Sequence, residues 1–259
     1  MFTFTTHAVL RQAWLENIRP VLLVNKVDRL VTELKLTPAE SHTHLQQLLE
    51  QVNAVMAQLI SGDIMKKAAL RDDNEKEVKS DQIGNGEDNV FNWDSGLHSD
   101  ENDDAHLYFS PIMGNVVFGS AIDGWAFGID DFAALYADKL GLNKQVLRKT
   151  LWGDFYFNSK TKKVMKGAQK AGKKSLFVQM IMDNIWKVYN TILEQSRDVS
   201  QLEKLASALN VKVAAKDLKS SDNRVTVKAI MSQWLPISRA TLSMVADYTP
   251  SLSTSQKRE

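Results

Sequence analysis

The chain has 259 residues and 44% hydrophobic side chains, enough apolar material for one large domain or two small ones. It has no cysteine, which excludes a disulfide framework and a thiolate metal site. The formal net charge is only +1, no apolar run approaches the roughly 18 residues of a membrane span, and the N-terminus has no secretory signal pattern. These features indicate a soluble intracellular protein.

The first predicted elements are a helix over residues 8–19 and a buried parallel strand over 20–24. The strand is followed by a polar loop with Asn25, Lys26 and Asp28. In open α/β sheets, ligands bind beyond the carboxyl ends of such strands. The Asp28 carboxylate can accept from guanine N1–H and N2–H together, and adenine has no such pair of donors. The Lys26 stem can lie over the purine, and Asn25 can bond the base and brace the loop. The alternative is a polar turn that matches by coincidence.

Residues Thr37 to Glu40 form a capping box with Pro38 at the first helical position. The box opens a long helix that we expect to end at residues 61–63. His42 and His44 lie two positions apart, so they do not share a helical face. We therefore expect both to be exposed and predict no metal site.

Residues 72–104 carry twelve acidic side chains against Lys76 and Lys79, a net charge of −10. Such a composition with few aliphatic residues predicts a disordered insertion over 72–106. It is either a solvated segment without function or an acidic arm that contacts a basic partner, with Phe91, Trp93 and Leu97 as possible anchors.

A second short strand is predicted over 115–119, followed by Ser120 and Ala121, whose backbone N–H can donate to guanine O6. A helix near 130–140 ends at Gly141. Beyond it we expect a hairpin around 155–165, a mostly apolar helix over 176–195, a helix capped at Ser200, and helices at 224–234 and 238–247.

A run of fifteen residues within this region has seven lysines and no acidic residue, which suits either a lysine-rich surface hairpin or contact with an RNA phosphate backbone. The lysines are Lys160, Lys162, Lys163, Lys166, Lys170, Lys173 and Lys174. Residues 167–175 nearly match a phosphate-binding loop, but Lys174 stands where Ser or Thr is required. We interpret them as a basic loop.

Several motifs together resemble the translational GTPases of the elongation factor 2 branch, and within it the cytoplasmic elongation factor-like GTPases of large (60S) ribosomal subunit maturation. The motifs are Asn25-Lys26-Val27-Asp28, Ser120-Ala121, Asp123-Gly124-Trp125-Ala126-Phe127, Trp152-Gly153-Asp154-Phe155-Tyr156-Phe157 and Trp234-Leu235-Pro236. The resemblance covers about residues 8–250. Elongation factor 2 itself has Ser-Gly at the position of Ser120-Ala121 and lacks a long acidic insertion.

The resemblance implies a cytoplasmic GTPase that binds GTP with Mg²⁺ and works with a maturation cofactor protein to release an anti-association factor from the large ribosomal subunit. Its partners would be rRNA and ribosomal proteins, with no membrane and no DNA. Asn25, Lys26, Asp28, Ser120 and Ala121 would hold guanine, and none of them would be catalytic.

The phosphate-binding loop, switch threonine and Asp-x-x-Gly loop of that family find no match before Asn25. We therefore expect a fragment that is inactive alone and binds no nucleotide at physiological concentrations. The alternative function is a non-catalytic fragment that binds the ribosome or another partner. A third possibility is a fragment that does not fold stably.

The predicted fold class is α/β: the C-terminal portion of a P-loop GTPase domain with an inserted α+β subdomain and a disordered acidic insertion. The predicted boundaries are an unrelated segment 1–7, GTP-binding portions 8–71 and 107–143 around the insertion 72–106, the inserted subdomain 144–235, and a final helix with a truncated exit segment 236–259.

Overall fold

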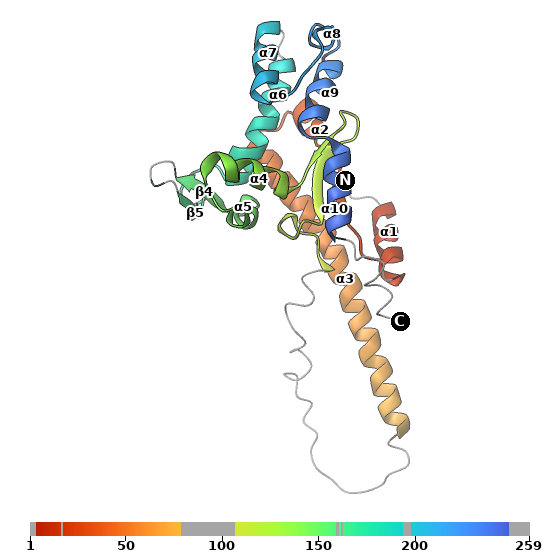
Figure 1. Ribbon diagram of the computed structural model, residues 1–259. Coiled ribbons are helices and arrows are strands. Elements are labelled where there is room, and N and C mark those ends of the chain that lie inside the picture. Colours follow the sequence, from red (N-terminus) through yellow and green to blue (C-terminus); the bar gives the residue numbers. More distant parts are fainter. Residues whose placement is uncertain are drawn as a thin grey trace. The chain divides into compact units, whose positions relative to one another are not determined.

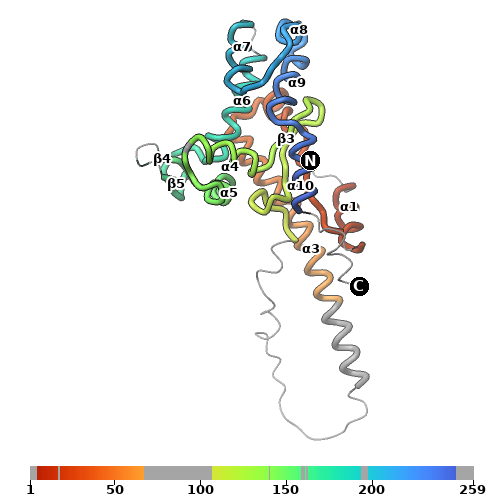
Figure 2. Tube along the Cα trace, in the orientation of Figure 1, coloured from red at the N-terminus to blue at the C-terminus, as the bar shows by residue number. Residues whose placement is uncertain are grey.

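The computed structural model describes residues 4–16, 18–78, 107–158, 161, 163–193 and 198–248, drawn as ribbon and as tube (Figures 1 and 2). The predicted acidic segment therefore lies outside the described residues from 79 to 106. The chain divides into two units. One comprises the described residues up to Pro20 and those from Leu48 to Phe109, and the other comprises Val21–Gln47 and the described residues from Ser110 onward.

The first unit contains α1 (Phe4–Leu15) and the greater part of α3 (Pro38–Val78). The Asn53 side-chain amide donates to the Phe109 carbonyl and accepts the Phe109 N–H, at 2.8 Å each, which fixes the start of the described segment 107–158 to α3. The buried positions of α3 in this unit follow helical spacing and are Leu49, Val52, Val55, Met56 and Ile60.

Helix α3 does not end at residues 61–63, so that prediction is wrong. It continues to Val78 and includes residues 72–78 of the predicted acidic segment. A glycine within a helix costs only about 1 kcal/mol relative to alanine. The residues after Gly62 include Met65, Lys66 and Lys67, which are good helix formers, so one glycine does not stop the helix.

The second unit contains a sheet in the order β1-β2-β3. Strand β1 (Leu22–Val24) is parallel to β2 (Val116–Ser120), and β2 is antiparallel to β3 (Trp125–Phe127). Every residue of β2 is buried. The strand predicted to be buried over 20–24 is only partly so, because in β1 Val24 is buried but Leu23 is 37% exposed. Helix α10 (Ile237–Tyr248) packs on β2 and β3 through Ala240 and Met244. The mixed helix and sheet content with a parallel pair agrees with the predicted α/β class.

The remaining elements of this unit are α2 (Asp28–Thr32), the 3₁₀ turn η3 (Pro111–Met113), α4 (Ile129–Leu140), α5 (Lys144–Leu151), the antiparallel hairpin of β4 (Phe155–Asn158) and β5 (Lys163–Lys166), the π-helical segment η4 (Phe177–Met182), α6 (Asp183–Leu193), α7 (Val199–Ala208), α8 (Ala215–Leu218) and α9 (Asn223–Trp234). The predicted hairpin and the helices near 130–140, 224–234 and 238–247 are confirmed. Helices α2, α5 and α8 and strand β3 were not predicted.

Of the two predicted helix caps, one is confirmed and the other is wrong. At α3, the Thr37 backbone N–H and hydroxyl both donate to Glu40 Oε2, at 2.8 and 2.7 Å, which confirms the capping box. At α7 the cap is Asp198, whose carboxylate accepts from the Ser200 backbone N–H at 2.9 Å. The prediction of Ser200 as the cap was wrong because a better acceptor lies two residues earlier.

His42 is buried inside an aromatic cluster, which corrects the prediction that it is exposed, whereas His44 is exposed as expected. The His42 ring stacks on Phe177 with ring centroids 4.7 Å apart and meets Trp152 edge-on at 5.1 Å. Residues three positions apart share a face of a helix, and Leu45, three positions after His42, is buried. His42 therefore lies on the buried face of α3. Burial lowers the pKa of His42 from 6.5 to about 4, so the ring is neutral at pH 7.

Stability is expected to fall between pH 6.5 and pH 4 through His42. The unfolded chain takes up the proton near pH 6.5 and the folded chain only near pH 4, so protons favour the unfolded state in this window. At 1.36 kcal/mol per pH unit, the loss at pH 4 is on the order of 3 kcal/mol. Urea unfolding of wild type and His42→Gln at pH 7 and pH 4.5 measures it. His44→Gln is the control, and an equal pH dependence in wild type and His42→Gln would contradict the assignment.

Among the described residues, no helix combines the length and apolar character needed to cross a bilayer.

Candidate functional site

Two polar turns meet at one edge of the sheet in the second unit. Because β1 and β2 are parallel, with Val24 paired to Phe118, their carboxyl ends lie side by side. The turn at residues 25–28 follows β1 and the turn at residues 120–124 follows β2. The five residues predicted to hold guanine therefore come from two adjacent turns, although about ninety positions separate them in the sequence.

Asn25 ties the two turns together. Its side-chain oxygen Oδ1 accepts the backbone N–H of Ala121 at 2.9 Å and that of Lys26 at 2.7 Å. A third bond joins the turns where the Val27 N–H donates to the carbonyl of Gly119, at 3.1 Å. Asn25 thus braces the loop, one of its two predicted roles. The Ala121 N–H, whose predicted acceptor was guanine O6, donates to Asn25 in this structure.

Lys26 has a left-handed backbone, with φ at +67°. Non-glycine residues seldom adopt this conformation, and it persists only where surrounding contacts hold it. Here the bond from its own N–H to Asn25 and the bond of Val27 to Gly119 hold the peptide on both sides. The Lys26 side chain is exposed, so its stem is available to a planar ligand.

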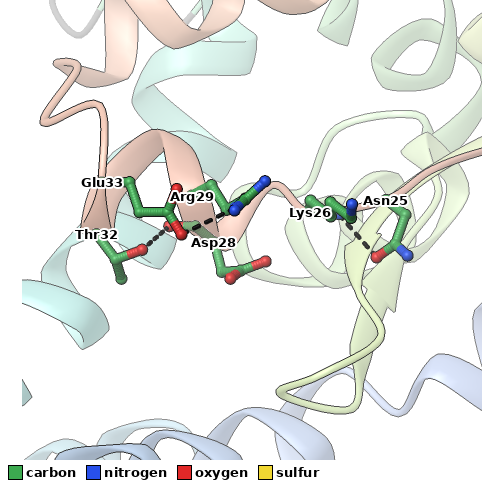
Figure 3. A network of polar contacts seen from close by, with 6 residues as sticks. All are labelled: Asn25, Lys26, Asp28, Arg29, Thr32 and Glu33. Atoms are coloured by element: carbon green, nitrogen blue, oxygen red, sulfur yellow. Dashed lines mark hydrogen bonds and ion pairs between the residues drawn. The ribbon is translucent and has the colours of Figure 1, made fainter. Parts of the chain in front are cut away.

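Asp28 is the first residue of α2, and it is 5% exposed. Within the described part of the chain, its carboxylate oxygen Oδ1 has no hydrogen-bond partner. The adjacent cation does not serve it, because Arg29 pairs with Glu33 at 2.8 Å. In Figure 3 the Asp28 carboxylate and the Asn25 amide extend to the same side of the turn. A buried carboxylate oxygen without a donor is costly, so this site suits a ligand that brings N–H donors.

Ser120 and Asp123 shape the second turn from inside. Ser120 is fully buried, and its hydroxyl oxygen accepts the Asp123 N–H at 3.2 Å. The Tyr189 hydroxyl, on α6, donates to Asp123 Oδ2 at 2.6 Å and accepts the Trp125 indole N–H at 2.8 Å. Burial and, less strongly, the nearby Asp28 raise the pKa of Asp123, while the Tyr189 bond lowers it.

The sequence did not predict this inner network. Asp123 belongs to one of the family motifs, and Tyr189 lies within the mostly apolar helix predicted over 176–195, but neither was a predicted site residue. The single available signal was the acidic residue beside Gly124 at the end of a buried strand. Tyr189, the partner of Asp123, lies 66 positions away in the sequence, and no local sequence pattern predicts a contact over that separation.

Five of the predicted basic residues lie in the described part of the chain, and all five are exposed: Lys163, Lys166, Lys170, Lys173 and Lys174. Lys160 and Lys162 lie outside it. The loop after β5 is held by Asp154, whose carbonyl accepts the Gly167 N–H at 2.7 Å and whose carboxylate accepts the Gln169 N–H at 2.9 Å. Lys174 pairs with Asp183 at 2.7 Å. An exposed strand, and not a buried one, leads into residues 167–175, which agrees with their interpretation as a basic loop.

No protein-family model matches the chain. Among curated proteins, it is similar to Elongation factor-like GTPase 1 of Homo sapiens, with 51% identity over 95% of this chain and 21% of that protein. It is also similar to Ribosome assembly protein 1 of Schizosaccharomyces pombe and of Saccharomyces cerevisiae, with 42% identity to each over 95% and 97% of this chain and 22% and 21% of those proteins. The chain thus spans about a fifth of the length of these relatives.

Proposed function

Since this chain is a homologue of the elongation factor-like GTPases, as its motifs predicted, we propose that it recognises the guanine base for a GTPase of ribosome assembly. The observation that carries this proposal is the buried Asp28 carboxylate, whose Oδ1 has no hydrogen-bond donor among the described residues. It lies at the carboxyl end of a strand whose turn is tied to a second turn. In the whole protein, the recognised GTP would be hydrolysed to drive large-subunit maturation by release of an anti-association factor, together with a maturation cofactor protein.

The chemistry of the turns favours guanine over other bases. Guanine has adjacent N1–H and N2–H donors, and a single carboxylate such as Asp28 accepts both. Adenine has a bare acceptor at N1, which a carboxylate repels. The Lys26 stem covers the base, while Asn25, Ser120 and Ala121 form the frame of the site. These contacts concern the base alone, so we assign no residue to phosphate, to Mg²⁺ or to catalysis.

The test is a nuclear magnetic resonance titration of the chain with GMP, IMP and AMP at millimolar concentrations, because base contacts alone give weak binding. We expect the backbone signals of residues 25–28 and 120–123 to respond most to GMP. IMP should bind more weakly, since hypoxanthine keeps N1–H but lacks the N2 amine. Equal responses to GMP and AMP would contradict the guanine assignment.

The exposed lysines support a second proposal, contact with ribosomal RNA or an acidic ribosomal protein. Asp154 holds the loop after β5, so its lysines are presented on a preformed turn with little ordering cost. Lys163 and Lys166 are the first and last residues of β5, Lys170 lies in the loop that follows, and all three are exposed. Phosphate contacts of this kind are strongly salt-dependent and have no sequence preference.

Changing Lys163, Lys166 and Lys170 together to alanine is expected to weaken binding to purified large ribosomal subunits and to flatten its salt dependence. Each lost phosphate contact lowers the slope of log K against log[salt] by roughly 0.7 to 0.9, so the loss is about 2 to 3 for the triple variant. Co-sedimentation over a salt series measures it. The control replaces three exposed lysines elsewhere, Lys212, Lys216 and Lys219. The same slope for both triple variants would argue against the surface.

A further inference from the structure

We propose that Tyr189 and Asp123 are positioning residues of the guanine site, acting from helix α6 through the turn at residues 120–124. This inference rests on the proposed function, because the turn they hold is one of the two that would frame the base. Neither residue is assigned to contact the base. Their role is to fix where the Ser120–Ala121 backbone lies relative to Asn25 and Asp28.

Three hydrogen bonds, joined by the covalent chain of residues 120–123, link α6 to the first turn. The Tyr189 hydroxyl donates to Asp123 Oδ2 at 2.6 Å, and the Asp123 backbone N–H donates to Ser120 Oγ at 3.2 Å. The next residue, Ala121, donates its N–H to Asn25 Oδ1 at 2.9 Å. That same oxygen accepts the N–H of Lys26 at 2.7 Å. Displacing any member therefore alters the turn that carries Asp28.

The Tyr189 end of this series is held firmly. Its hydroxyl accepts the Trp125 indole N–H at 2.8 Å while donating to Asp123, so the orientation of the O–H is fixed. Tyr189 is 1% exposed and Trp125 is fully buried. Water therefore does not replace the hydroxyl easily if it is removed.

Asp123 depends on this one hydroxyl. Asp123 is 3% exposed, and among the described residues the other oxygen of its carboxylate, Oδ1, has no hydrogen-bond partner. Without the Tyr189 hydroxyl, a buried carboxylate would have no donor on either oxygen, and the turn would have to move to bring it to solvent. A hydrogen bond to a charged group is stronger than one between neutral groups. Its loss is therefore expected to displace the backbone of the turn that carries Asp123.

Asp123 is also affected by the charges around it. The nearby Asp28 contributes to raising the pKa of Asp123, and Arg224 and Lys228 on α9 oppose it. The Tyr189 hydrogen bond thus holds the Asp123 carboxylate of the second turn in a fixed position among these charges.

The experiment compares Tyr189→Phe with Tyr136→Phe. Tyr136 is a matched control, because its hydroxyl also makes two hydrogen bonds, donating to the Met180 carbonyl at 3.0 Å and accepting from Asn184 at 2.9 Å, with no link to either turn. We expect Tyr189→Phe to raise the hydrogen-exchange rate of the Ala121 amide about tenfold and to weaken GMP binding about tenfold, and Tyr136→Phe to do neither.

The outcomes separate this inference from the guanine assignment. If wild type prefers GMP to AMP and Tyr189→Phe keeps the wild-type affinity and the wild-type Ala121 exchange, the positioning role is wrong while guanine recognition stands. If wild type does not distinguish GMP from AMP, the guanine assignment fails and this inference fails with it. Should Tyr189→Phe not fold, Asp123→Asn replaces it, since it keeps the shape and weakens the bond. Unchanged Ala121 exchange in Asp123→Asn would then overturn the role.

Discussion

Replacing Asp28 with Asn is expected to reverse the base preference of the chain from guanine to xanthine. Asparagine loses the charge that accepts N1–H and N2–H, and it turns an N–H₂ group toward the guanine amine. Hydrogen bonds to a charged group contribute about 1.5 to 3 kcal/mol each, so GMP affinity should fall roughly a hundredfold. Xanthine has a carbonyl at C2 in place of the amine, and it therefore accepts the new N–H donor while still donating N1–H.

The measurement is a titration of wild type and Asp28→Asn with GMP and XMP, followed at the signals of residues 25–28. Glu33→Gln is a matched control, because it removes one charge from the residue following α2 and breaks only the exposed pair with Arg29. Such surface pairs contribute about 0 to 1 kcal/mol, so base preference should stay as in wild type. If Asp28→Asn binds GMP and XMP in the same ratio as wild type, Asp28 does not read the base.

Replacing Gly119 with Ala is expected to destabilise the second unit by about 3 kcal/mol or more, at the upper end of overpacking effects. A Cβ at this position would lie 2.4 Å from the carbonyl oxygen of Trp125 and 2.6 Å from Cβ of Ala126. Both atoms belong to β3, which pairs with β2 at this point, so relief requires separating the strands. The Gly119 carbonyl also accepts the Val27 N–H, which holds β2 from the other side.

Urea unfolding measures the effect, and the Gly119→Ala chain should in addition lose the chemical-shift pattern of both turns. Gly62→Ala is the control, because a Cβ there meets nothing within 4 Å inside helix α3. It should stabilise the helix by about 1 kcal/mol. Equal stability of Gly119→Ala and wild type would show that the strand contact is looser than the structure has it.

The elements that could be predicted from the sequence are those with a local cause. The continuous apolar runs before Asn25 and Ser120 gave the two parallel strands, and their shared direction placed the polar turns together. The Thr37–Glu40 capping box was readable because donor and acceptor lie within four residues. The assignment of Asn25, Lys26, Asp28, Ser120 and Ala121 to the base stays a prediction.

What could not be predicted depends on distant partners. His42 sits in a polar stretch of sequence, and only the folding of Phe177 and Trp152 onto α3 buries it. Asp123 and Tyr189 are 66 positions apart, and the role of each is visible only once β2 and α6 are adjacent. The extension of α3 past Gly62 was missed because a weak local breaker was given more weight than the helix formers after it.

The double use of the Asn25 oxygen has a consequence for how quickly the site can respond. Since Ala121 already donates to Asn25, a base that claims this N–H through its O6 atom must first compete with an intramolecular acceptor. This exchange of acceptors makes the association rate lower than the diffusion-limited rate. Afterwards Asn25 Oδ1 accepts only the N–H of Lys26. Binding of the base would therefore break the hydrogen bond between Ala121 and Asn25, which joins the turns after β1 and β2. A kinetic measurement can distinguish this two-step binding from binding in a single step.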